Sequence, residues 1–127
     1  MLQVALNHHY EITYNSNKRR FYLKICGLWS HADQISGYVS HWEEALSLTN
    51  GERFNILSDL SDMEKHPEDV LEIHKIVETL WDREGLLNKT AIVTAANPKL
   101  KKIAPFSYSK RFDTLQEADH WLEVNLM

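Results

Sequence analysis

Phe54-Asn-Ile-Leu-Ser-Asp-Leu-Ser-Asp62 is the stretch that decides the fold of this chain. Its apolar part, which ends at Leu57, lacks a clean alternation and is typical of a short strand covered on both faces. Alternating Ser and Asp follow, and Pro67-Glu-Asp69 then marks a helix start. The pattern predicts a buried strand whose polar end lies beside a helix N-terminus, a usual place for a site in an α/β domain.

The residues before this strand predict a β-hairpin followed by a helix. Two runs alternate between apolar and polar residues, and the segment 15–18 between them contains Asn residues that tolerate the positive φ of a tight turn. The helix is expected to begin near Ser30 or His31 and to stop at Thr49-Asn-Gly51. The apolar positions of the hairpin are Tyr10, Ile12, Tyr14, Phe21, Leu23 and Ile25, and those of the helix are Ile35, Val39, Trp42 and Leu46.

The residues after this strand predict a helix, two strands and a final helix. The first helix runs from Pro67 to Gly85, and a central strand follows at 89–96. After an irregular connection, a brief edge strand is expected at 110–112, and Thr114 and Glu117 are spaced as the capping box of the last helix. The chain therefore predicts one α/β domain over residues 1–127, with a mixed sheet of four or five strands in which Ile56 and Ile92 are buried.

Composition excludes several classes of protein. A chain of 127 residues is one domain, and its net charge of −4 argues against a dedicated nucleic-acid binder. Cys26 is the only cysteine, so an internal disulfide and a cysteine metal cluster are impossible. The start Met1–Leu6 lacks the features of a signal peptide, and no apolar run approaches the ~20 residues that span a bilayer. We expect a cytoplasmic protein with no membrane span.

Several local strings resemble those of the STAS-like domains, the anti-sigma-factor antagonist fold and the bacterial proteins grouped near it. The strings are Cys26-Gly-Leu-Trp29, Ile56-Leu-Ser-Asp-Leu-Ser-Asp62, Ala91-Ile-Val-Thr94 and Arg111-Phe-Asp-Thr-Leu-Gln-Glu-Ala-Asp-His-Trp-Leu122. The resemblance implies helices packed on a mixed sheet, and a role in binding other proteins. Regulated antagonists carry a phosphorylated serine at the start of the helix that follows the strand matched here by Phe54–Leu57. Here Lys65-His-Pro-Glu-Asp69 has no hydroxyl, so no phosphorylation switch is expected there.

The candidate site consists of Asp59, Ser61, Asp62 and His66. Hydroxyls and free backbone N–H groups near a helix N-terminus can hold an anion or a partner's carboxylate, although two Asp residues oppose this. The alternative interpretation is structural: Asp59 or Asp62 ties the chain through an Asx-type bond or caps a turn. The seven His residues lack metal-ligand spacing, so neither a metal nor a cofactor is expected. A basic cluster around Lys101, Lys102 and Tyr108 is the rival binding surface.

No complete catalytic set is present, so the leading hypothesis is a non-catalytic protein-interaction or regulatory module. A small carrier of apolar or lipid-like ligands is the first alternative, and deep apolar volume would favour it. A hydrolase that uses Asp59, Ser61 and His66 is the second, and a Ser–His hydrogen bond with an orienting Asp would favour it. The partner or ligand is not named by the sequence, and a homodimer is left open.

Overall fold

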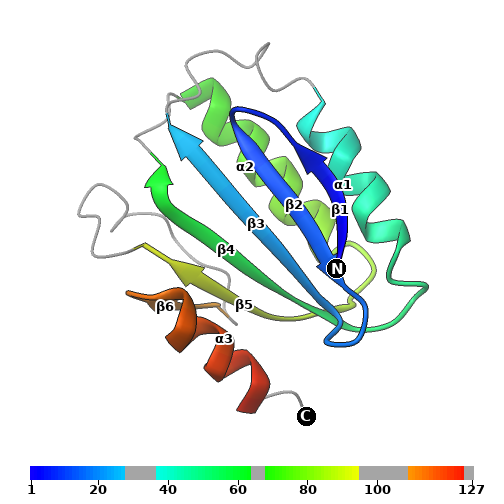
Figure 1. Ribbon diagram of the computed structural model, residues 1–127. Helices are drawn as coiled ribbons and strands as arrows, with labels where there is room; N and C mark the ends of the chain where they lie inside the picture. Colours follow the sequence, from blue (N-terminus) through cyan, green and yellow to red (C-terminus); the bar gives the residue numbers. More distant parts are fainter. Residues whose placement is uncertain (28–36, 64–67, 95–108, 125–127) are drawn as a thin grey trace.

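The computed structural model describes residues 1–27, 37–63, 68–94 and 109–124, which form a mixed sheet of six strands with three helices packed on it (Figure 1). The strands are β1 Leu2–Leu6, β2 Tyr10–Asn15, β3 Arg20–Gly27, β4 Phe54–Met63, β5 Leu87–Val93 and β6 Ser109–Phe112. The helices are α1 Tyr38–Ser47, α2 Glu68–Trp81 and α3 Leu115–Val124. The α/β class predicted from the sequence is confirmed.

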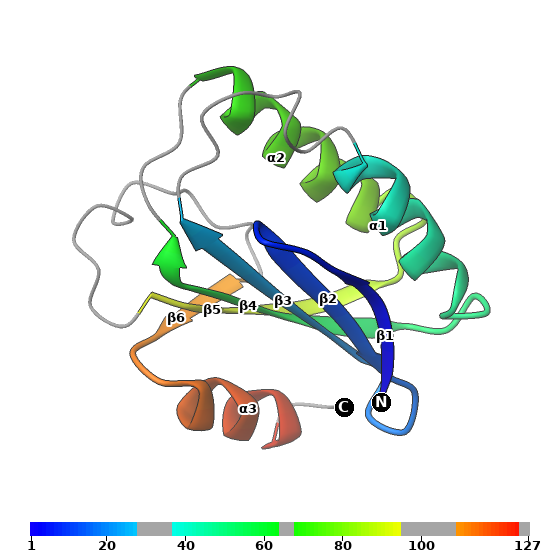
Figure 2. The same cartoon turned by 45° about the horizontal axis from the view of Figure 1, so that its top comes forward.

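The strands lie in the sheet in the same order as in the chain. The first three pair antiparallel, whereas β3, β4, β5 and β6 pair parallel. The connections through α1 and α2 advance across the sheet in one direction, and crossovers of one hand then place both helices on the same face. Figure 2 shows the resulting layers, with α1 and α2 on one face of the sheet and α3 on the other.

The predicted number of strands was too low by one, because β1 pairs antiparallel with β2. The register shifts between Gln3 and Ala5, so that Val4 stands outside the regular pairing. An irregularity of this kind interrupts the alternation of faces, which is the signal that sequence reading depends on. Residues 2–6 therefore gave no strand pattern, and His8 and His9 lie in the connection between β1 and β2.

The predicted hairpin is confirmed as β2 and β3, with Tyr14 opposite Phe21. Its turn differs from the prediction, because the residue with positive φ is Arg19, at 50°, and neither Asn adopts this conformation. Asn15 acts differently, since its side-chain oxygen accepts a hydrogen bond from the Lys18 N–H at 3.2 Å. The predicted stop after the first helix is present, with positive φ at both Asn50 and Gly51.

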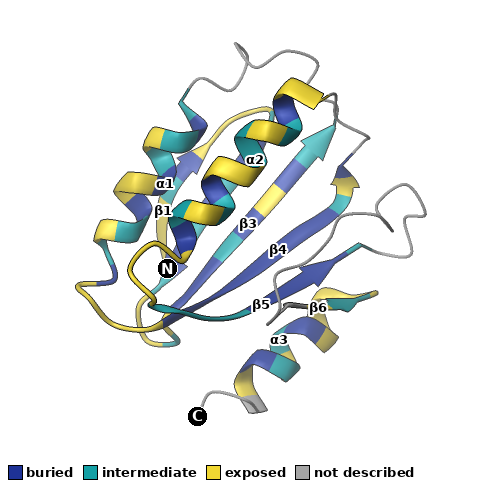
Figure 3. Cartoon of the chain, turned by 180° about the vertical axis from the view of Figure 1, so that it is seen from behind, coloured by how far each residue is buried: buried dark blue, intermediate teal, exposed yellow. Residues whose placement is uncertain are grey.

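Two apolar clusters hold the layers together. The larger lies between the sheet and the pair α1 and α2, where Trp42 and Trp81 pack edge to face with ring centroids 5.1 Å apart. The smaller lies under α3, and its buried members are Leu57, Ala91, Val93, Ala118 and Leu122. β4 contributes to both clusters, and Figure 3 shows it buried along most of its length. The expected capping box is present in part, since Thr114 Oγ1 accepts from the Glu117 N–H at 3.2 Å.

A fully buried arginine joins α3 to the sheet. Arg20, the first residue of β3, forms an ion pair with Asp119 of α3 through Nη1. The Tyr22 hydroxyl donates to the same Asp119 oxygen at 3.1 Å, and Glu123 lies 3.9 Å from Arg20 Nη2. Among the described residues, the Nε and Nη2 groups of Arg20 have no hydrogen-bond partner. Asp119 therefore provides most of the charge compensation for the buried guanidinium of Arg20.

Substitutions of the two central isoleucines test the core. Both Ile56 and Ile92 are buried as predicted, so we expect Ile56→Ala and Ile92→Ala to lower the free energy of unfolding by ~2–5 kcal/mol. The Ile92 effect should be the smaller, because Ile92 retains 7% exposure whereas Ile56 has none. Urea denaturation followed by tryptophan fluorescence measures both values, and a loss below ~1 kcal/mol at Ile56 would contradict this packing.

The Arg20–Asp119 pair should respond asymmetrically to substitution. Asp119→Asn leaves a buried guanidinium without its carboxylate, and we expect a loss of about 2–3 kcal/mol in urea denaturation. Arg20→Met removes the buried charge and keeps most of the volume, so its cost should be smaller, because the half-exposed Asp119 can be solvated. Glu123→Gln is the control and should cost less than about 1 kcal/mol. A larger loss for Arg20→Met than for Asp119→Asn would refute this account.

Candidate functional site

Three of the four predicted site residues lie inside a strand. β4 was expected to end at Leu57, but it continues to Met63 and so includes Asp59, Ser61 and Asp62. The pairing with β3 shifts between Lys24, which lies opposite Asp59, and Cys26, which lies opposite Asp62. β4 therefore carries one extra residue there, a bulge that lets the strand continue while it re-aims its side chains.

Asp59 is buried and holds the bulge together. Its Oδ1 atom accepts hydrogen bonds from the Ser61 backbone N–H at 3.1 Å and from the Ser61 hydroxyl at 2.5 Å. The first of these is the Asx-type bond of the structural interpretation, and it satisfies a backbone donor that the bulge removes from the regular ladder. Asp59 and Ser61 thus form a local bracket within the strand.

Asp62 faces solvent and pairs with the neighbouring strand. Its Oδ2 atom lies 3.4 Å from Lys24 Nζ, and this carboxylate raises the pKa of Lys24 by hydrogen bonding. Glu11 of β2 lies opposite Lys24 in the register and therefore shares its face of the sheet. We call Lys24, Asp59, Ser61 and Asp62 the carboxyl-end cluster. It lies on the face of the sheet that carries α3, at the ends of β3 and β4 that extend beyond this helix (Figure 1).

The fourth predicted residue, His66, lies outside the described residues, as do Pro67 and the rival basic surface around Lys101, Lys102 and Tyr108. The structure therefore brings together Asp59, Ser61 and Asp62, and adds Lys24, which the sequence did not single out. The alternation of β3 could have shown that Lys24 lies on its outward face. The pairing of Lys24 with Asp62 could not be predicted, because the bulge in β4 decides which residue lies beside Lys24. The Ser61 hydroxyl, the proposed nucleophile of the hydrolase alternative, donates to Asp59.

The topology differs from the one that usually creates a crevice at the carboxyl ends of parallel strands. Such a crevice opens where successive crossovers lie on opposite faces of the sheet. Here α1 and α2 both cover the same face, so no reversal of this kind occurs beside β4 (Figure 2). The carboxyl-end cluster is consequently part of a sheet surface, which suits contact with another surface better than enclosure of a small molecule.

A second polar group, missed in the sequence, lies between β2 and α1. The hydroxyl of Tyr10 and Nδ1 of His41 are 2.6 Å apart, and the Tyr10 ring packs edge to face on Tyr38 at 4.7 Å. Burial raises the pKa of both tyrosines, so both hydroxyls stay neutral at physiological pH. Tyr10 and Tyr38 are almost fully buried, and the Tyr10–His41 bond fastens α1 to the sheet. Sequence periodicity showed Tyr10 as an inward residue but could not reveal its partner on a distant helix.

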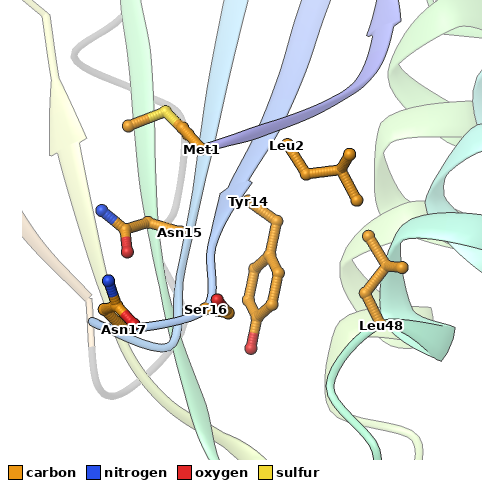
Figure 4. A pocket seen from close by; sticks show the side chains of 7 residues that line it. All are labelled: Met1, Leu2, Tyr14, Asn15, Ser16, Asn17 and Leu48. Atoms are coloured by element: carbon orange, nitrogen blue, oxygen red, sulfur yellow. The ribbon is translucent and has the colours of Figure 1, made fainter.

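A hollow of about 380 Å³ lies at the opposite end of the sheet, beside the start of β1 (Figure 4). Met1, Leu2, Tyr14 and Leu48 supply apolar surface, and the hairpin residues 15–17 supply polar groups. Its volume is near the lower end of the range for ligand sites. It lies far along the strands from the carboxyl-end cluster, since Leu2 pairs with Tyr14 near the hairpin turn.

Comparisons with known proteins add no relative: no protein-family model, no curated protein and no solved structure matches the chain. Within the described ranges, no group of three or more His, Cys, Asp or Glu side chains is placed to hold a metal ion. None of the helices in the described part of the chain has the length and apolar character needed to cross a membrane.

The bracket between Asp59 and Ser61 predicts a difference between two alanine variants. Asp59→Ala removes the acceptor of both bonds and leaves a backbone N–H without its partner, so we expect a loss of about 1–3 kcal/mol in the free energy of unfolding. Ser61→Ala removes only the hydroxyl donor, and its loss should be about 1 kcal/mol or less. Urea denaturation compares the two, and a larger effect of Ser61→Ala would show that Ser61 is held by something other than Asp59.

Proposed function

We propose that this protein is a small cytoplasmic, non-catalytic module that binds another protein through the carboxyl-end cluster. The observation that carries the proposal is that two carboxylates on one strand have different roles. Asp59 is buried and fixes the backbone, while Asp62 is exposed on the strand that it fixes. A charged group on a rigid strand loses little freedom when a partner binds it, which favours recognition.

The surroundings of Asp62 indicate the chemistry of the partner. The face of β1, β2 and β3 that carries Asp62's neighbour Lys24 also carries Gln3, Glu11 and Thr13. Apart from Leu6 and Tyr22, this face is polar, as expected for the antiparallel half of a sheet that faces water. With Asp62 and Glu11 against Lys24, the balance of exposed charge is acidic. A partner surface that bears Lys or Arg is the complement.

The resemblance to STAS-like domains supports a regulatory role for this binding. The absence of Ser and Thr from Lys65-His-Pro-Glu-Asp69 favours binding that is not switched by phosphorylation at the start of α2. The acidic composition and the single cysteine agree with a cytoplasmic location.

Capture from a lysate of the native host, with a matched pair of charge reversals, tests the proposal. Asp62→Lys should lose a partner that the wild-type protein retains, because it reverses the charge that the partner reads. Glu72→Lys on α2 is the control, since Glu72 and Asp62 are both 63% exposed and each pairs with a lysine. Both variants should change the free energy of unfolding by less than about 1 kcal/mol. Loss of the same partner from both variants, or from neither, would refute the proposed site.

A small carrier of apolar ligands is the second candidate, and the hollow beside Leu48 is the observation that favours it. A fluorescent fatty-acid probe distinguishes the two functions. For a carrier, Leu48→Arg should abolish saturable binding of the probe while Asp62→Lys leaves it unchanged. For the interaction module, the wild-type protein should show no saturable binding of the probe.

A further inference from the structure

The outer edge of β1 has two of the features that protect sheet edges, a short length and a register shift near Val4, but it lacks two others. β1 is the first strand in the sheet order, and within the described residues it pairs with β2 alone. The N–H and C=O groups on the outer side of such a strand form a template for another strand. Figure 2 shows β1 at the margin of the sheet, with α1 over one face. Residues 2–6 contain neither a charged residue nor proline, which are two of the features that protect an edge from pairing.

The opposite edge of the same sheet provides a comparison. β6 carries Lys110 and Arg111, two cations in a strand of four residues. β1, in contrast, exposes leucines on both faces of the sheet: Leu2 lies opposite Tyr14 on the face of α1, and Leu6 lies opposite Glu11 on the other face. Leu2 is 54% exposed, Leu6 is 64% exposed, and Met1 beside them is 78% exposed. These are three of the five large hydrophobic residues that the described part of the chain exposes.

We propose that β1 pairs with β1 of a second copy of this chain, antiparallel and across a two-fold axis. The two sheets then become one continuous sheet, and the axis passes near Val4. This arrangement brings Leu2 and Gln3 of one copy beside Ala5 and Leu6 of the other. Leu2 and Leu6 stay on opposite faces of the continuous sheet, and on each face the partner strand covers part of the leucine that lies beside it. The shifted residue Val4 lies between the two paired segments.

Charge and symmetry select a second copy as the occupant. A two-fold contact sets a strand against its own sequence, so like charges in the strand would repel one another across the axis. β1 has none, whereas a β6–β6 contact would bring Lys110 and Arg111 of both copies together. A contact between β1 and β6 would be head to tail and would continue into an open chain of molecules. Of the two contacts that close after two copies, only β1–β1 brings no like charges of the strands together.

Lysine substitutions at the edge test the proposal with the full chain. We expect the wild-type protein to be a dimer in sedimentation equilibrium at about 100 µM, a concentration that saturates a contact of micromolar Kd. Leu2→Lys and Leu6→Lys should each raise the dimer Kd at least about tenfold, because each places two charges in the contact. Ile76→Lys is the matched control: Ile76 is also 54% exposed but lies on α2, and its variant should remain dimeric. Circular dichroism checks that every variant is folded.

Cross-linking tests the position of the axis. In a Cys26→Ser background, Val4→Cys should form a disulfide-linked dimer on mild oxidation, since facing residues of antiparallel strands lie within disulfide reach. Ile76→Cys in the same background is the control and should remain uncross-linked. A monomeric wild-type protein would overturn the proposal, even if a foreign strand were found on β1. A dimer that withstands both edge lysines, or one cross-linked through Ile76→Cys alone, would equally overturn it.

Discussion

The burial of β4 on both of its faces is the constraint on which the rest of the structure depends. Ile56 and Leu60 pack towards α1 and α2, while Leu57 packs under α3. A strand covered in this way cannot leave polar groups unpaired, because each one would cost free energy in an apolar interior. The bulge at its end breaks the regular ladder, and the Asp59 carboxylate supplies the missing acceptor. The same requirement that builds the core therefore fixes the residues next to Asp62.

The third layer depends on charge as well as on apolar area. α3 buries Ala118 and Leu122 against the sheet, but it also brings Asp119 to the buried guanidinium of Arg20. Buried ion pairs seldom add much net stability, because both groups lose water. Such a pair instead favours one arrangement of the chain over others, since α3 in any other position would leave Arg20 without its counter-charge. We interpret this pair as the device that fixes where α3 lies on the sheet.

The two proposals use different parts of one sheet. Protein binding is assigned to the carboxyl-end cluster on β3 and β4, where a charged side chain stands on a fixed backbone. Self-association is assigned to the β1 edge, where unpaired backbone and exposed leucines lie together. The polar face between them, which carries Glu11 and Lys24, would become a double-width surface in the dimer. Two copies of the cluster on one continuous sheet would suit a partner that is itself two-fold symmetric.

The sequence by itself determined the elements that repeat a local pattern. Alternation revealed β2 and β3, and the Thr114–Glu117 spacing revealed the start of α3. Helical spacing revealed α2 and the body of α1, but α1 begins at Tyr38, whereas the start expected near Ser30 or His31 lies outside the described residues. These features depend on near neighbours in the chain, so a single sequence displays them. Strands that contain a bulge are harder to predict, because the bulge interrupts the alternation of apolar and polar residues by which a strand is recognised. For that reason β1 was missed. β4 was made too short for another reason: its polar residues from Ser58 to Asp62 were taken to follow the strand, although the strand continues through them.

Only the tertiary structure decided which distant side chains meet. Arg20 and Asp119 are 99 residues apart, and Tyr10 and His41 are 31 apart, so no spacing rule connects either pair. The site shows the same division. The sequence placed Asp59, Ser61 and Asp62 at the end of the central strand, but their separate roles follow from burial and from the position of Lys24 on the next strand. Local preference selects the elements, and the packing of the sheet selects the partners.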